Sequence, residues 1–533
     1  MATRNKSPRD AHQEEFYFPL IQKFAQQPRA GWILAIVYGV VMLIVNLAYH
    51  RVGDYNVETD FYWSYIPQAQ HLLQGHITIE DFHGPLYPIV LALLSLVTQD
   101  LFHAGVIVST LSAAVTLFFA FQLFRRWFRA EIAFAAVVMM GVNTTFVQHA
   151  YSAGTDMLFN ALVIGGTFFL LKDDVRSWRN LLIAAVLFAL GYLTRYNGLF
   201  VVVAVPAVVL LVNPFGLSWR DRVITAAVFI VAFIVLITPW GLYCLREKGS
   251  FFYNKNYLNI AYEMFARNRI TWDQFWSIES QRYTSLSQVV FLDVEAFFKN
   301  LLNNALTHGA SDMGKLLGWP VGVCSLYGLS VLFRRANDKR ELSFLVLAAG
   351  FYGVLLLVFY SERFSLFLLP AYLALAFRAL SDSSVARIRI GGRLTIARLL
   401  VAALVVWTAS ASYLFNSRNI DSGPVEVLSI AEGFQNSGEQ VPPGTIVVTR
   451  KPHIAYYLKM QMVLFPLVHS NDELEREVRK LNASYLYFSY VEAQFRPEFR
   501  SLLEIRSAPP WLKPVAFTNF PPAVLYRVQF ATP

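Results

Sequence analysis

The first residues that could do chemistry form an acidic run, Glu58-Thr59-Asp60, just before a stretch whose apolar residues recur at helical spacing. Carboxylates beside an apolar surface cost free energy, so a function for them is worth considering. A carboxylate in this position could act as a general base that takes the proton of a hydroxyl group. The simpler alternative is that Asp60 caps the N-terminus of the following helix.

Further polar residues interrupt apolar runs elsewhere. Asp156 begins one run beside Gly154-Thr155, where it could equally serve as a helix cap. Arg195 is a lone cation between two apolar stretches, and Arg363 follows Glu362 between two others. Each arginine could bind a phosphate group or simply extend toward lipid headgroups.

His83 lies close in sequence to Glu80 and Asp81. Clusters of Asp, Glu and His can hold a divalent metal, so Mg²⁺ or Mn²⁺ is left open as a cofactor. The spacing is not diagnostic, and no residue is assigned as a metal ligand. Cys244 and Cys324, both inside apolar runs, are the only two cysteines, and that count excludes a disulfide framework.

The composition shows what must position these residues. Of the 533 residues 56% are hydrophobic and only 15% are charged, against about 25% charged in a soluble domain. A membrane-spanning helix needs roughly 17–25 mostly apolar residues. The sequence predicts an all-α polytopic membrane domain over residues 31–415, with about eleven spans: 31–49, 105–123, 131–149, 156–171, 181–194, 198–213, 223–243, 314–333, 342–360, 364–380 and 398–415.

The basic residues indicate the topology. They gather in alternate connecting segments, whereas the intervening short loops carry only Arg51, Arg195 and Arg363. Cationic loops prefer the cytoplasm, so the N-terminal segment 1–30 is predicted to be cytoplasmic and the C-terminus to lie outside. The same rule folds residues 181–212 into a hairpin with Arg195 at its apex. Topology accounts for the net charge of +9, and nucleic acid is not needed to explain it.

Three larger pieces then lie on the outer face. Residues 50–104 are predicted to contain two interfacial helices, one ending at Gly75 and one over 85–97. Residues 257–265, followed by Arg267 and Arg269, suggest a third surface helix within the piece 244–313. The tail 416–533 is predicted to be a small α/β domain, with strands at 445–449, 485–489 and 524–530 and a helix over 471–482.

Several stretches together resemble the C-type membrane glycosyltransferases, in the bacterial branch related to dolichyl-phosphate-mannose protein mannosyltransferases and the lipid A aminoarabinose transferase. The order of the stretches matches the family over roughly residues 30–380. They are Val57–Tyr65 leading to His71-Leu-Leu-Gln-Gly75, His83-Gly-Pro-Leu-Tyr-Pro88, Gly154–Phe159, Gly191–Gly198, Thr238-Pro-Trp-Gly-Leu242 and Glu362–Pro370.

The resemblance implies a catalytic carboxylate at Asp60 and a second aspartate near the active site at Asp156. It places Arg195 where the family has a basic residue after the fifth span. It also implies an inverting transfer of sugar from a polyprenyl-phosphate donor to a lipid, glycan or protein acceptor.

The sequence also departs from the family pattern. Where the aminoarabinose transferase has an acidic-basic pair and, elsewhere, an Arg-Tyr pair, this chain has His83-Gly84 and Trp63-Ser64. Another basic group must then hold the phosphate, and the candidate substrate-binding residues are Glu58, His83, Arg195, Arg267, Arg269 and Arg363.

The predicted location is a bacterial inner membrane, with the tail domain in the periplasm. A transporter or flippase of a lipid-linked saccharide is the alternative. It would favour ionisable residues near the membrane midplane and repeats between the chain halves, and neither pattern is found in the sequence. A non-catalytic assembly protein that binds partners through its tail is the second alternative.

Overall fold

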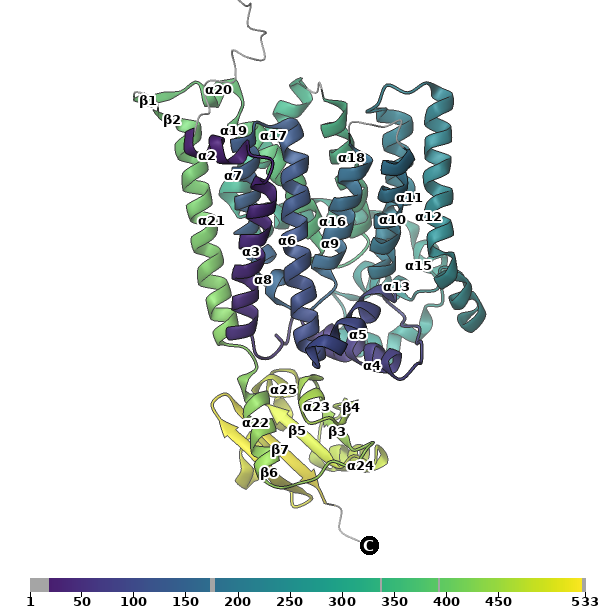
Figure 1. Ribbon diagram of the computed structural model, residues 1–533. Coiled ribbons are helices and arrows are strands. Elements are labelled where there is room, and N and C mark those ends of the chain that lie inside the picture. Colours follow the sequence, from purple (N-terminus) through teal and green to yellow (C-terminus); the bar gives the residue numbers. More distant parts are fainter. Residues whose placement is uncertain (1–18, 173–177, 336–337, 392–393, 530–533) are drawn as a thin grey trace, which may run out of the picture.

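Long apolar helices run side by side and form the body of the molecule (Figure 1). The structure, a computed structural model, describes residues 19–172, 178–335, 338–391 and 394–529. Among these, four helical stretches are long and apolar enough to cross a membrane, or up to five if a bent pair counts as one span. The four are α3 (Ala30–Ala48), α6 (Leu101–Trp127), α12 (Trp219–Lys248) and the stretch that begins with α21 (Ile396–Asp421).

Shorter helices occupy most of the other predicted spans. The pair α7 (Ala130–Gly141) and α8 (Thr144–Tyr151) bends by 62° where Asn143 caps α8 through Phe146 N. The remaining elements of the bundle are α9 (Asp156–Leu170), α10 (Trp178–Thr194), η2 (Tyr196–Phe200), α11 (Val201–Ala207), η3 (Val208–Val212), α17 (Trp319–Arg335), α18 (Lys339–Leu355), η8 (Phe364–Leu368) and α19 (Leu369–Leu380). The mostly helical fold is confirmed, while the count of eleven spans stays a prediction.

The break predicted at Arg195 is present. Helix α10 ends at Thr194, and the chain turns into η2 and α11 through Arg195, whose backbone is extended. The two helical stretches lie beside α12 (Figure 1). The turn therefore presents Arg195 at the end of the bundle nearer the C-terminal domain.

Small residues allow close helix packing inside the bundle. A Cβ atom on Gly328 of α17 would clash with the carbonyl oxygen of Leu375 on α19. Such contacts are common between helices in membranes, where dispersion between closely packed surfaces holds the helices together. The largest fully buried side chains of the bundle include Phe121, Phe124 and Phe229.

The segment between α3 and α6 contains the two predicted interfacial helices. The first comprises η1 (Phe61–Tyr65) and α4 (Ile66–Leu73), and the second is α5 (Leu86–Thr98). They lie across the end of the bundle that faces the C-terminal domain (Figure 1).

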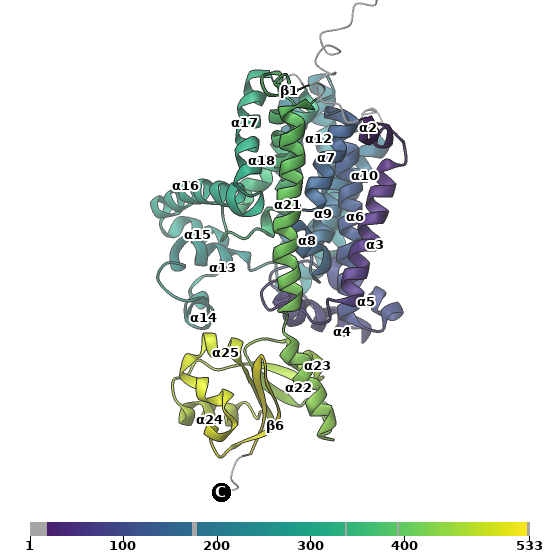
Figure 2. The same cartoon turned by 90° about the vertical axis from the view of Figure 1, so that its left-hand side faces the viewer.

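The chain between α12 and α17 forms a lobe that projects from the side of the bundle (Figure 2). The predicted surface helix at 257–265 forms its first part. The elements of the lobe are α13 (Asn256–Ala261), η4 (Tyr262–Ala266), α14 (Trp272–Gln274), η5 (Phe275–Glu279), η6 (Ser280–Arg282), α15 (Leu286–Leu292), α16 (Val294–Ser311) and η7 (Asp312–Leu316).

The C-terminal domain is built on a five-stranded sheet with the order β4-β3-β5-β7-β6. Strand β3 runs parallel to β4 and β5, whereas β7 pairs antiparallel with β5 and β6. The three predicted strands and the helix capped by Ser470 are all present. The elements are α22 (Val425–Asn436), β3 (Ile446–Thr449), α23 (His453–Tyr457), β4 (Gln461–Leu464), α24 (Asn471–Lys480), β5 (Tyr485–Ser489), α25 (Tyr490–Phe495), η9 (Pro497–Leu503), η10 (Ile505–Ser507), β6 (Leu512–Asn519) and β7 (Pro522–Val528).

The domain and the N-terminal helix α2 (Pro19–Ala25) lie at opposite ends of the bundle (Figure 1). The short elements α20 (Ser383–Ala386), β1 (Arg389–Gly391) and β2 (Leu394–Thr395) are at the same end as α2. This arrangement fits the predicted placement of the two termini on different sides of a membrane, though it does not assign the sides. Most of the predicted cytoplasmic segment 1–30 lies outside the described residues.

Candidate active site

The loop before η1 is fixed by its own carboxylates. Glu58 is fully buried and accepts a hydrogen bond from Asp54 N at 2.6 Å. It also lies 3.1 Å from His50 Nε2 and accepts from Ala153 N, between α8 and α9. Because its carboxylate oxygens are already bound, Glu58 ties the loop to the bundle and is not open to a substrate in this structure.

Asp60 leaves the same loop in a different direction. Its side chain makes no capping hydrogen bond to η1. Instead, Arg363 Nη2 donates to Asp60 Oδ2 at 3.0 Å, and the Asp60 side chain remains 58% exposed. The carboxylate is therefore held in one direction by a cation and is still accessible to another molecule.

Asp156 and Arg195 form a second, buried ion pair. Arg195 Nη1 donates to Asp156 Oδ1, and the two side chains are only 17% and 7% exposed, respectively. Helix α9 begins at Asp156, so its N-cap position is Thr155, whose side chain makes no capping hydrogen bond. The Asp156 carboxylate therefore pairs with Arg195 and does not act as the helix cap. A buried ion pair needs good geometry to offset its loss of hydration.

Phe364 joins the two ion pairs. The guanidinium groups of Arg195 and Arg363 lie 5.2 Å and 5.0 Å from the centre of its ring, within the range of cation–π attraction. Burial opposes the charge of Arg363, but the Asp60 and Asp156 carboxylates raise the pKa of that guanidinium above its ordinary value. The cluster Asp60–Arg363–Phe364–Arg195–Asp156 is named here the acid–arginine cluster.

His83 lies beside this cluster. Its Nε2 is 2.9 Å from Ser64 Oγ and 3.3 Å from Glu80 Oε2, and its ring packs 4.2 Å from that of Tyr65. Burial lowers the pKa of His83 to about 4, although the Asp60 carboxylate opposes that effect. His83 is therefore neutral near pH 7 and can act there as a hydrogen-bond partner.

This pKa shift predicts how stability depends on pH. Between pH 6.5 and about 4 the unfolded chain binds a proton at His83 that the folded chain does not, so stability falls as the pH falls. The contribution of one such group changes by about 1.4 kcal/mol per pH unit. We expect His83→Gln to lose less stability than wild type between pH 7 and pH 5, measured by thermal unfolding in detergent. The same loss in both proteins would contradict the shift.

Two of the candidate arginines lie elsewhere. Arg267 pairs with Glu263 at 3.0 Å, and Arg269 donates to the Phe265 carbonyl. Both are on the lobe between α12 and α17, where they bind groups of η4 and not the acid–arginine cluster. Of the predicted site residues, the structure gathers Asp60, Asp156, Arg195, Arg363 and His83.

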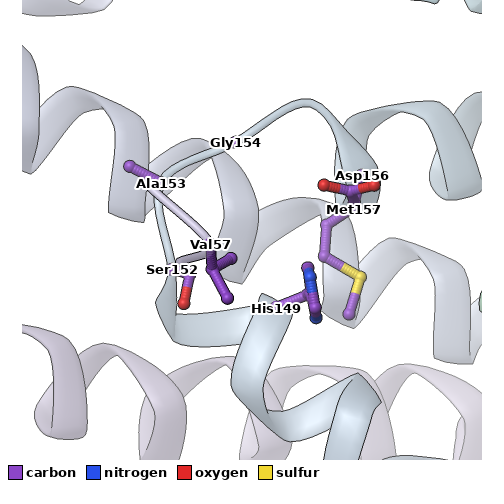
Figure 3. A pocket seen from close by; sticks show the side chains of 7 residues that line it. All are labelled: Val57, His149, Ser152, Ala153, Gly154, Asp156 and Met157. Atoms are coloured by element: carbon purple, nitrogen blue, oxygen red, sulfur yellow. The ribbon is translucent and has the colours of Figure 1, made fainter. Parts of the chain in front are cut away.

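A small pocket is lined in part by Asp156 of the cluster (Figure 3). It has almost no room even for a water molecule, whereas typical ligand pockets have volumes of roughly 300–1,000 Å³. Its lining residues are Val57, His149, Ser152, Ala153, Gly154, Asp156 and Met157.

No group of three or more His, Cys, Asp or Glu side chains in the described residues is arranged to hold a metal ion.

The C-terminal domain brings Lys451 and His453 to the site, and neither was predicted from the sequence. Lys451 donates to the Tyr55 carbonyl at 2.7 Å and to Thr59 Oγ1 at 3.1 Å, directly before Asp60. His453 packs its ring 4.3 Å from that of Tyr62. No motif in the tail marks these residues, and only the docking of the domain reveals them.

Comparisons with known proteins agree with this architecture. The family model of the dolichyl-phosphate-mannose-protein mannosyltransferases matches residues 82–243, which include Asp156 and Arg195. By sequence, none of the curated proteins matches the chain.

Solved structures match over nearly the whole chain. ArnT from Cupriavidus metallidurans bound to undecaprenyl phosphate superposes with a TM-score of 0.56 at 14% identity, covering 94% of this chain and 98% of that one. Its apo state gives 0.57. AglB, an oligosaccharyltransferase from Archaeoglobus fulgidus in complex with an inhibitory peptide and a dolichol-phosphate, gives 0.55 at 12% identity and covers 87% of this chain and 70% of its own.

These matches show the fold of the chain. The chain has the helical fold of the C-type membrane glycosyltransferases, followed by a small C-terminal α/β domain. The resemblance to that superfamily, predicted from the ordered motifs, is confirmed.

Proposed function

We propose that this protein transfers a sugar from a polyprenyl-phosphate donor to a hydroxyl group of a lipid, glycan or protein acceptor, with inversion at the anomeric carbon. The observation that carries the proposal is the exposed Asp60 carboxylate held by Arg363. The related folds of ArnT and AglB, with undecaprenyl phosphate and dolichol-phosphate respectively, support the choice of donor.

Asp60 is assigned as the general base. It takes the proton of the acceptor hydroxyl while the hydroxyl oxygen attacks the anomeric carbon. The bond from that carbon to the phosphate oxygen breaks, and the lipid phosphate leaves with the bonding electrons. General base catalysis needs the carboxylate within hydrogen-bond reach of the acceptor, and the exposure of Asp60 permits that approach.

The two arginines of the cluster are assigned to the donor phosphate. Arginine suits this task because its planar guanidinium can present two parallel N–H groups to phosphate oxygens. Both guanidinium side chains are partly exposed, Arg363 by 22% and Arg195 by 17%. His83, neutral beside Tyr65, is assigned as a hydrogen-bond partner of the sugar or phosphate.

The membrane placement is also part of the proposal. We place the protein in a bacterial inner membrane, with α2 toward the cytoplasm and the C-terminal domain on the periplasmic side. This orientation follows the predicted excess of basic residues at the α2 end. The donor and the acceptor then meet at the outer leaflet, where the acid–arginine cluster lies.

The phosphate assignment predicts an effect on donor affinity. We expect Arg363→Gln to weaken binding of undecaprenyl phosphate about 10- to 100-fold, because a hydrogen bond to a charged group contributes about 1.5–3 kcal/mol. Arg500→Gln removes an exposed arginine of the C-terminal domain and should leave the affinity unchanged. Binding is measured by tryptophan fluorescence in lipid nanodiscs, and equal affinities of Arg363→Gln and wild type would remove Arg363 from the phosphate site.

A further inference from the structure

The C-terminal domain contacts the loop that carries Asp60. The segment after β3, residues 450–457, lies against residues 51–62. These belong to the segment between α3 and α6, which is called the first loop. Tyr457 donates through its hydroxyl to the Arg51 carbonyl at 3.1 Å, and the His453 ring packs 4.8 Å from that of Tyr55. Tyr55 is part of the hydrophobic core of the domain. The first loop and the domain therefore share one packed interface.

Lys451 is the polar centre of this interface. Its ammonium group donates to the Tyr55 carbonyl and to Thr59 Oγ1, and Thr59 itself donates to the same Tyr55 carbonyl. These three groups close the turn that ends at Asp60. The position of the Asp60 backbone thus depends on a side chain from a domain almost 400 residues away in sequence, since Lys451 and Thr59 are 392 residues apart.

The neighbouring residue anchors the same segment in another direction. Arg450 Nη2 donates to Asp273 Oδ1 at 2.6 Å, and Arg496 Nη2 donates to Asp273 Oδ2 at 3.1 Å. Asp273 belongs to α14 of the lateral lobe. Two successive residues, Arg450 and Lys451, therefore hold the domain against the lobe and against the segment between α3 and α6. Figure 2 shows the domain next to α14 of the lobe.

A lysine in this interface loses hydration of its ammonium group, which costs free energy. Lys451 is half-buried, and burial lowers the pKa of its ammonium, with a further contribution from Arg450. Its direct partners are a carbonyl and a hydroxyl, both neutral. The carboxylates that act on it through space are Asp54, Asp60 and Glu492. An apolar side chain would fill the site at lower desolvation cost, so the lysine points to a need for the turn geometry.

We propose that Lys451 is a positioning residue for Asp60, and that the C-terminal domain is thereby an integral part of the active centre. The inference rests on the proposed function, because it assumes that Asp60 is the base. Lys451 acts through Tyr55 and Thr59 and does not touch the substrate. Its loss displaces the carboxylate from the acceptor hydroxyl without removing any group that holds the donor phosphate.

The test uses the full-length protein in nanodiscs with a labelled polyprenyl-phosphate sugar. Lys451→Met should lower kcat at least tenfold, while the KM for the donor stays within twofold of the wild-type value. Lys451→Arg, which restores a cationic donor, should recover most of the rate. Lys513→Met changes an exposed lysine on β6 and is the matched control, with kcat and KM unchanged.

A second variant approaches the same contact from the other side. Thr59→Val keeps the shape of the side chain and removes the hydroxyl that Lys451 binds, so it should also lower kcat. This variant tests the inference independently should Lys451→Met fail to fold. Wild-type kcat in either folded variant would overturn the inference. Absence of transfer by the wild type, with every polyprenyl-phosphate sugar supplied, would overturn the proposed function instead.

Discussion

Replacing Asp60 by asparagine should lower the rate of sugar transfer by about 10²–10⁴-fold, the usual contribution of a positioned general base. The amide has nearly the shape of the carboxylate but cannot take a proton from the acceptor. Because the Asp60 side chain is 58% exposed, the variant should fold and insert as wild type does. The rate is measured with labelled polyprenyl-phosphate sugars and purified protein in nanodiscs.

The same experiment includes a control for charge. Asp472→Asn removes an exposed carboxylate from the first turn of α24, far from the cluster, and should retain the wild-type rate. The donor KM of Asp60→Asn should change much less than its kcat, because the donor phosphate is assigned to the arginines. Near-normal turnover in Asp60→Asn would end the assignment of Asp60 as base.

Replacing Asp156 by alanine should cost about 3–5 kcal/mol of stability, because it leaves the Arg195 charge without a partner in a buried site. Both side chains of this pair are mostly buried, so solvent cannot easily replace the lost carboxylate. The loss is measured as a change in the free energy of unfolding in mixed micelles. A change below 1 kcal/mol would show that the pair is solvated and weak.

A double-mutant cycle separates the pair from the effect of an orphaned charge. Arg195→Met should also destabilise, but the double variant Asp156→Ala/Arg195→Met should be less destabilised than the sum of the two single changes. Replacing both members of a buried ion pair by apolar groups is often close to neutral. Additive losses would mean that the two residues act independently.

Much of the helical fold could be predicted from the sequence, because apolar length and basic flanks are local signals. The predicted span at 223–243 lies within α12, and the break at Arg195 lies where the charge pattern put it. The kinked pair α7–α8 was predicted as a single span, since Asn143 gives only a weak polar signal inside an apolar run. Whether all eleven stretches cross the membrane remains a prediction.

The C-terminal domain was only partly predictable. Strand β5 is buried along its whole length and gives a clear apolar run. Two strands did not appear in the sequence pattern. Edge strand β4 is half exposed, and edge strand β6 contains Pro514, which normally argues against a strand. On an edge strand, however, the missing N–H of a proline can face away from the sheet, so that no hydrogen bond between strands is lost.

The site required the structure because its contacts join distant parts of the chain. Asp60 and Arg363 are 303 residues apart, so their individual residue types suggested roles but not their pairing. Phe364 was visible only as part of a motif, and its position between two guanidinium groups depends on how η8 packs. Lys451 lies in a domain with no catalytic pattern, and its role depends entirely on docking.

The proposed function requires that this protein breaks the bond between a sugar and a polyprenyl phosphate and does not merely move the intact lipid. The most direct test reconstitutes the purified wild type in sealed vesicles that contain a polyprenyl-phosphate sugar labelled in both the sugar and the lipid, together with candidate acceptors. We expect the sugar label to leave the lipid and appear on an acceptor, with free polyprenyl phosphate as the second product. Movement of the doubly labelled lipid between leaflets, with both labels still joined, would rule out sugar transfer and identify a flippase.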